Sequence, residues 1–227
     1  MTPTLLYLIT PLVEDPAAFA PRLREAAGTG AVAAVQLRLP ARDERALINH
    51  VKALAPVAQE HGAAVVVAIE GEGAAELDLA RIAARGGADG VHVRDLESAR
   101  ALRERLETDR VVGIGGLRTR HDAMTAGEIG VDYLVFGEPR PDGSLPALDL
   151  TQERAAWWAE IFETPCVAYA PNLEDVEALA LTGAEFVALG PAAFDHPEGL
   201  AAALSAARAV LDRIDAERAR RAEEEGR

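Results

Sequence analysis

Two polar residues stand at the end of an otherwise apolar segment near the beginning of the chain. The segment AVAAVQLRLP starts at Ala31 with small apolar residues and then carries Gln36 and Arg38, two positions apart. Side chains alternate along a β-strand, so these two would point to the same side. A guanidinium there can bind an anion, or it can pair with a rim carboxylate such as Glu70. Gln36 can equally be a hydrogen-bonded residue within the strand layer.

Two other reactive residue types occur inside apolar segments. His92 lies within GVHV, where we expect a hydrogen-bonded histidine of the core or rim rather than a catalytic one. Cys166, the only cysteine, lies between Pro165 and Val167. In such surroundings a thiol is expected to be a small core residue rather than a nucleophile.

The elements that must position these residues repeat regularly along the chain. Runs with β-type composition alternate with segments of helical periodicity, such as LESARALRERLE, and glycine often precedes the next run. The runs occupy residues 4–10, 31–39, 63–70, 90–93, 110–116, 133–138, 165–171 and 186–191. Eight such units predict a single-domain (β/α)8 TIM barrel over residues 1–215, followed by a charged helical tail over 216–227.

In a barrel of this kind the active site lies at the carboxyl ends of the strands. The residues that leave the strands are therefore the candidates for chemistry. They are Gln36, Arg38, Glu70, Glu72, Arg94, Asp95, Gly115, Gly116, Arg118, Glu138, Arg140, Asn172, Gly190, Pro191 and Ala192.

Composition limits the partners that the chain can have. A formal net charge of −14 argues against nucleic acid, which needs a concentrated basic surface, but not against a small phosphorylated ligand. No run is long enough for a membrane span, and the first residues lack the pattern of a signal peptide. A single cysteine fits the reducing cytoplasm. The sequence leaves open whether the chain forms a homo-oligomer.

Several strand segments together resemble the thiamine phosphate synthase and thiazole tautomerase superfamily. The matching pieces are LYLIT, VQLR, GADGVHV, VVGIGG, GVDYLVFGEP and GAEFVALGPAAF. Each piece alone is weak, but their order and spacing are fairly specific. The synthases of this family join a pyrimidine-methanol diphosphate to a thiazole phosphate and release diphosphate with the help of Mg²⁺.

The resemblance implies roles for particular residues. Gln36 and Arg38 would hold the diphosphate, while backbone N–H groups around Gly190 and Ala192 would hold the thiazole phosphate, with Asn172 as a further binding candidate. Glu70 and Asp95 would be the carboxylates for Mg²⁺. Asp95 also precedes LESARALRE, where it fits a helix N-cap.

The chain also departs from the family pattern at six loops. Pro40 stands where a lysine is usual, and Gly115 stands where the family has serine. The Thr-x-Thr-Lys segment after the sixth strand is missing. The tautomerases use a histidine after the fifth strand, for which His121 is the nearest candidate. We therefore expect a synthase-like transferase, with a non-catalytic phosphate-binding paralogue (a sensor or partner subunit) or a barrel enzyme of altered chemistry as alternatives.

Overall fold

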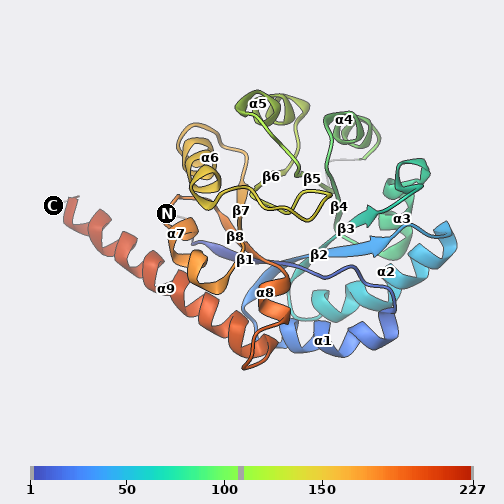
Figure 1. Ribbon diagram of the computed structural model, residues 1–227, viewed down its shortest axis with the longest axis horizontal. Coiled ribbons are helices and arrows are strands. Elements are labelled where there is room, and N and C mark those ends of the chain that lie inside the picture. Colours follow the sequence, from blue (N-terminus) through green and yellow to red (C-terminus); the bar gives the residue numbers. More distant parts are fainter. Residues whose placement is uncertain (1–2, 107–109, 226–227) are drawn as a thin grey trace.

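The computed structural model describes residues 3–106 and 110–225, and their strands form a closed parallel barrel (Figure 1). The strands pair in chain order, and the eighth pairs with the first. They are β1 (Leu5–Ile9), β2 (Val32–Pro40), β3 (Ala64–Glu70), β4 (Gly90–Val93), β5 (Val111–Ile114), β6 (Tyr133–Phe136), β7 (Cys166–Ala170) and β8 (Phe186–Leu189). The predicted TIM barrel is confirmed.

The helices lie outside the strands and cover the barrel (Figure 1). They are α1 (Pro16–Gly28), α2 (Glu44–Gln59), α3 (Leu79–Gly86), α4 (Leu96–Arg105), α5 (Arg120–Ile129), α6 (Leu148–Ile161), α7 (Val176–Ala180), α8 (Pro191–Phe194) and α9 (Leu200–Glu225), with 3-10 turns η1 (Ala74–Glu76) and η2 (Leu173–Asp175). After the last strand the structure has a short α8 before α9, because Pro191 fixes a helical turn directly after the strand.

Strand residues alternate between two cores, as the period of a β-strand requires. Leu6 and Leu8 belong to the large core between strands and helices, whereas Tyr7 and Ile9 belong to the smaller core inside the barrel. The inner core also contains Tyr133 from β6 and Tyr169 from β7. Its aromatic rings bring hydroxyl groups into the barrel interior.

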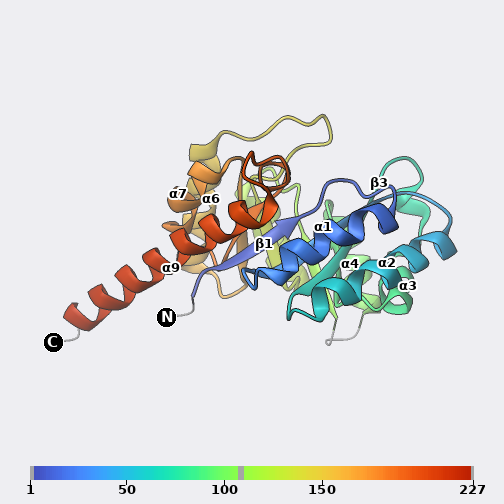
Figure 2. The same cartoon turned by 90° about the horizontal axis from the view of Figure 1, so that it is seen from below.

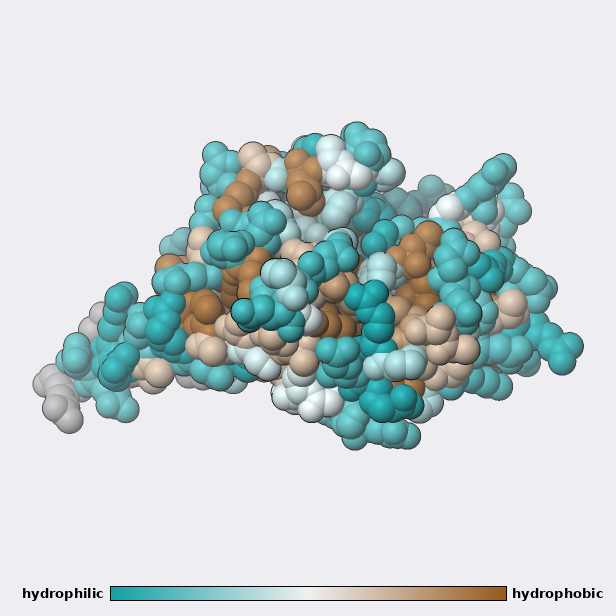
Figure 3. All heavy atoms as spheres, turned by 60° about the horizontal axis from the view of Figure 1, so that its bottom comes forward, coloured by the Kyte–Doolittle hydropathy of each residue, from teal (hydrophilic) through white to brown (hydrophobic). Residues whose placement is uncertain are grey.

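Helix α9 runs beyond the barrel, and its C-terminal end projects from the rest of the molecule (Figures 1 and 2). The helix is continuous through residue 216, where the sequence predicted the tail to begin. Its projecting end is mainly hydrophilic on the face in Figure 3, where hydrophobic side chains form separate patches. Among the described residues, no helix is long and apolar enough to cross a membrane.

Candidate active site

A cavity of about 950 Å³ opens at the carboxyl end of the barrel. Both Gln36 and Arg38 line it, so the prediction that they share one side of their strand is confirmed. The other polar residues lining it include Glu70, His92, Arg94, Asp95, Arg105, Glu138, Arg140 and Tyr169. Arginines and carboxylates thus alternate around the mouth, which suits a ligand that carries both anionic and polar groups.

Arg38 is held by Glu70 on the neighbouring strand. Its Nε lies 2.6 Å from Glu70 Oε1 and its Nη2 lies 2.8 Å from Oε2, while Nη1 donates to the Thr10 carbonyl at 3.3 Å. Hydrogen bonding from Arg38 lowers the pKa of the Glu70 carboxyl below its ordinary value. A guanidinium has five N–H donors, and three are used here. The rim pair named as one alternative is therefore present, and two donors remain for an anion.

A chain of buried hydroxyl, amide and imidazole groups crosses the floor of the cavity. The Tyr7 hydroxyl donates to Gln36 Oε1 at 3.3 Å and lies 2.8 Å from the Tyr133 hydroxyl. The Tyr133 hydroxyl is also 3.0 Å from His92 Nδ1. Gln36 is thus hydrogen-bonded inside the barrel, as its second interpretation required, and His92 is buried and hydrogen-bonded.

Glu138 adds a buried carboxylate to this floor. Only 6% of the residue is exposed, and its Oε2 lies 3.4 Å from His92 Nε2. Its Oε1 lies 2.8 Å from Arg94 Nη1 without the alignment of a hydrogen bond. Arg94 also donates to the Pro139 carbonyl at 2.6 Å. Sequence reasoning placed Glu138 at the end of a strand but assigned it no role.

Gly115 explains how a carboxylate fits at this place. A Cβ atom on Gly115 would lie 2.4 Å from Glu138 Cδ, well inside van der Waals contact. The serine that the family pattern predicts at this position would therefore collide with Glu138. Gly115, which departs from that pattern, is therefore sterically coupled to Glu138, and the glycine was the signal in the sequence for the space that the carboxyl group occupies.

The remaining predicted binding residues lie nearby but outside the residues that line the cavity. Asn172 directly precedes η2 as its N-cap, and its side-chain amide donates to Asp175 Oδ2 at 3.1 Å. Gly190 and Ala192 flank Pro191, which does line the cavity. A Cβ atom on Gly190 would lie 3.0 Å from the Tyr169 hydroxyl, so this glycine keeps the backbone close to the mouth.

Two of the metal candidates are already engaged by protein groups. Both Glu70 oxygens accept from Arg38, and Asp95 Oδ1 accepts from the Ser98 N–H at 2.8 Å as the N-cap of α4. No three His, Cys, Asp or Glu side chains form a metal-binding group in the described part of the chain. Because Mg²⁺ needs only one or two carboxylates when phosphates complete its shell, Glu70 and Asp95 fit it only beside a bound diphosphate.

Cys166 is placed as the sequence predicted, whereas His121 does not join the other candidate residues. Cys166 is fully buried, and burial raises the pKa of its thiol, which makes it a poor nucleophile. His121 is the second residue of α5. It does not line the cavity, so the structure does not bring it to the other candidate residues.

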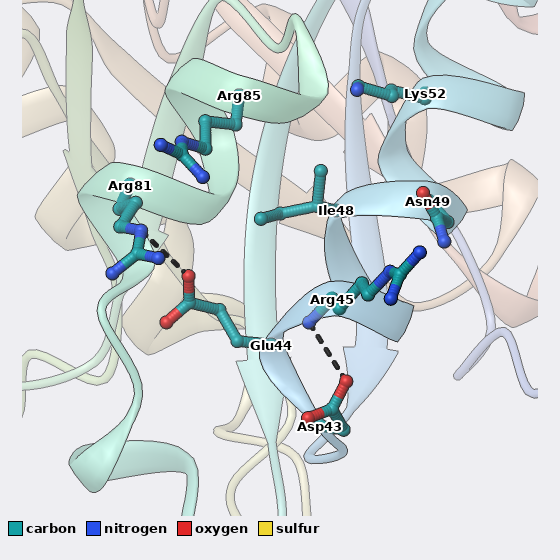
Figure 4. Close-up of a pocket in the computed structure, with 8 residues that line it drawn as sticks. All are labelled: Asp43, Glu44, Arg45, Ile48, Asn49, Lys52, Arg81 and Arg85. Carbon is teal, nitrogen blue, oxygen red and sulfur yellow. Dashed lines mark hydrogen bonds and ion pairs between the residues drawn. The ribbon is translucent and has the colours of Figure 1, made fainter.

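A second hollow lies outside the barrel, between α2 and α3 (Figure 4). Arg45, Lys52, Arg81 and Arg85 surround Ile48 there, and Arg81 pairs with Glu44 at 2.9 Å. This hollow is formed by side chains on the helical surface. None of the residues predicted for binding lies in it.

Comparisons with known proteins agree with this arrangement. Residues 6–193 match the family described as thiamine monophosphate synthase. The chain is 39% identical over 208 residues to thiamine-phosphate synthase of Rhodospirillum centenum, covering 90% of this chain and 96% of that protein. It is 35% identical over 224 residues to thiamine-phosphate synthase of Hyphomonas neptunium, covering 93% and 95%.

A solved structure gives the same fold. Thiamine phosphate pyrophosphorylase from Pyrococcus furiosus superposes with a TM-score of 0.72 at 22% identity, over 92% of this chain and 96% of that one. Together with the match over residues 6–193, this places the resemblance across the whole barrel. The chain belongs to the thiamine monophosphate synthase family.

Proposed function

We propose that the protein is a thiamine phosphate synthase that works at the barrel mouth. The observation that carries this proposal is the cavity that holds Gln36 and Arg38 side by side at the end of β2. The relatives named above are called thiamine-phosphate synthases, and their similarity extends over most of this chain. A phosphorylated small molecule is the partner that this cavity suits.

The residues at the mouth would bind different groups of the two substrates in such a reaction. The two remaining donors of Arg38 would bind the diphosphate of the pyrimidine substrate, and the N–H groups near Gly190 and Ala192 would bind the thiazole phosphate. Charge builds up on the departing diphosphate, so cationic groups here lower the barrier. Mg²⁺ beside Glu70 and Asp95 would neutralise further charge on it.

The direct test supplies purified protein with hydroxymethylpyrimidine diphosphate, thiazole phosphate and Mg²⁺, and measures thiamine phosphate and diphosphate. We expect both products in equal amounts. We also expect slower turnover than in family members with the full set of loop residues, since one lost donor costs about 2.7–4 kcal/mol of barrier. No product under these conditions would overturn the synthase proposal.

A matched pair of variants tests the role of Arg38. Without Mg²⁺, Arg38→Met should weaken inorganic diphosphate binding roughly thirtyfold, because one charge-assisted contact of about 2 kcal/mol is lost. Glu70→Gln should strengthen it, because the carboxylate that competes for Arg38 is gone. Equal diphosphate affinity in the wild type and both variants would show that Arg38 is a structural residue of the rim that does not bind the diphosphate.

The second candidate is a paralogue that binds phosphate without turnover. The observation that favours it is the pairing of two of the mouth arginines, Arg38 with Glu70 and Arg94 with Glu138. Thermal-shift measurements with thiazole phosphate, thiamine phosphate and diphosphate distinguish the two. Stabilisation without product formation supports the paralogue, and a ligand at 100 times its Kd should add about 2.7 kcal/mol to the free energy of unfolding.

For either candidate the cytoplasm is the compartment that we propose, because the buried thiol needs no oxidising environment.

A further inference from the structure

The buried chain at the cavity floor has a defined hydrogen-bond direction. Burial raises the pKa of both tyrosine hydroxyls, so each keeps its single proton. The Tyr7 proton goes to Gln36 Oε1, which can only accept. Tyr133 must then donate to the Tyr7 oxygen, and its own oxygen is left to accept from His92. His92 therefore carries a proton on Nδ1.

This direction leaves the other imidazole nitrogen facing a carboxylate. His92 Nε2 lies 3.4 Å from Glu138 Oε2. With Nδ1 protonated and no further proton present, a bare nitrogen lone pair would face a negative oxygen, which is repulsive. A proton held between these two atoms, on the imidazole or on the carboxyl group, would replace this repulsion by attraction.

The pair is also incomplete within the protein. In the described part of the chain, His92 Nε2 and Glu138 Oε1 are buried and no protein group forms an aligned hydrogen bond with either atom. Such buried polar atoms are rare in proteins. Both residues line the mouth cavity. A ligand there can therefore supply the missing partner.

We propose that His92 and Glu138 form a proton-donating pair that protonates the departing oxygen of a phosphorylated ligand bound in the mouth cavity. This role rests on the proposed function. The methylene C–O bond breaks, and its electron pair goes to the diphosphate oxygen, which takes the proton of the pair. The thiazole nitrogen forms the new C–N bond with its lone pair, and solvent later returns one proton to the pair.

Charged and hydroxyl side chains from several strands surround this pair. Arg94 faces Glu138 from the end of β4, and the Arg38–Glu70 pair spans β2 and β3. Tyr133 and Tyr7 face His92 from β6 and β1, and Tyr169 reaches the same cavity from β7. Gly115 on the neighbouring loop leaves the room that the Glu138 carboxyl occupies.

The first test is independent of activity and uses ¹⁵N-histidine NMR of the full chain. The His92 signals are identified by their loss in His92→Asn. We expect Nδ1 to be protonated in the wild type, and Tyr133→Phe, which removes its acceptor, to change this state. A neutral ring protonated only on Nε2 would overturn the proposal, whether or not the protein makes thiamine phosphate.

The second test measures synthase kinetics. Glu138→Gln keeps the shape but cannot pass a proton, so kcat should fall about a hundredfold while KM for both substrates changes little. The loss of rate at high pH that a proton donor causes should disappear in this variant. Glu153→Gln, an exposed residue paired with Arg120, is the matched control and should leave kcat unchanged. A wild-type kcat in Glu138→Gln would refute the pair, whereas an inactive wild type would refute the proposed function and leave the NMR result to decide.

Discussion

At the residue scale, the mouth of the barrel is a set of paired charges rather than free ones. Arg38 and Glu70 bond through both carboxylate oxygens, and roughly a quarter of each side chain is exposed. Such a pair orients the guanidinium and leaves its positive charge in place. An arriving phosphate therefore finds an oriented donor, but it must compete with Glu70.

The Arg38–Glu70 pair should stabilise the fold only where Glu70 is ionised. The folded pKa of Glu70 lies below its ordinary value of 4.5, so the stabilisation is complete above that pH and is lost as pH falls through the lower folded value. A double-mutant cycle with Arg38→Met and Glu70→Gln, measured by urea unfolding, should give a coupling of about 1 kcal/mol at pH 7. The coupling should shrink below pH 4.5; a coupling that grows there would contradict this assignment.

Gly115 and Glu138 should behave as one unit. Gly115→Ser places a side chain 2.4 Å from the Glu138 carboxyl carbon, so the buried carboxyl must leave Arg94 and His92. We expect a loss of about 1–3 kcal/mol in the free energy of unfolding. In a protein that already carries Glu138→Ala, Gly115→Ser should leave the free energy of unfolding nearly unchanged. Equal costs in both backgrounds, measured by urea unfolding, would disprove the coupling.

Some of these residues could be predicted from the sequence and some could not. Arg38 and Gln36 were identifiable because polar residues stand out at the end of an apolar strand. Glu138 also follows the end of a strand, but its partners are His92 on β4 and Arg94 directly after it, two strands away. Contacts across a barrel depend on strand register and tilt, which local spacing does not report.

At the element scale, the strands are matched to one another by side-chain size. Gly113 on β5 lies beneath the ring of Tyr133 on β6, where a Cβ atom would be 1.9 Å from the ring carbon Cζ. The two residues are direct partners in the parallel register. The glycine therefore allows Tyr133 to point inward and reach both Tyr7 and His92.

Gly113→Ala should displace the Tyr133 ring and break the polar chain. We expect a loss of about 3 kcal/mol in the free energy of unfolding, from overpacking and from buried groups left unpaired. The control is Gly28→Ala at the end of α1, where a Cβ atom would meet nothing within 4 Å. Gly28→Ala should raise the free energy of unfolding by at most about 1 kcal/mol, because alanine favours a helix. Similar melting temperatures for the two variants would contradict the proposed packing.

Element positions followed from the sequence more closely than element ends did. The run 186–191 was expected as one strand, but β8 ends at Leu189 and Pro191 already begins α8. A local pattern of apolar residues cannot separate a strand end from a short helical turn, because both are buried. The proline was the signal for this boundary.

At the scale of the whole molecule, the C-terminal helix α9 contacts the N-terminal segment of the chain. Thr4 precedes β1, and its backbone N–H and hydroxyl both bond to Asp215 on α9, at 2.9 and 3.2 Å. Arg208 donates to the Thr4 carbonyl at 2.9 Å. Because β1 pairs with both β2 and β8, these contacts support the place where the barrel closes.

Arg218 extends this support beyond the residue where the tail was predicted to begin. Its guanidinium donates to Thr4 Oγ1 at 3.1 Å and to the Ala180 carbonyl at the end of α7. Arg218→Ala should therefore lower the free energy of unfolding by about 1 kcal/mol, and Arg221→Ala, at an exposed position, should change it by less than about 0.5 kcal/mol. Urea unfolding of both variants and of a chain ending at Arg218 measures the difference. The shortened chain should have the same free energy of unfolding as the full chain, because it keeps every contact named here. A shortened chain as unstable as Arg218→Ala would show that the projecting end of α9 stabilises the barrel by other contacts.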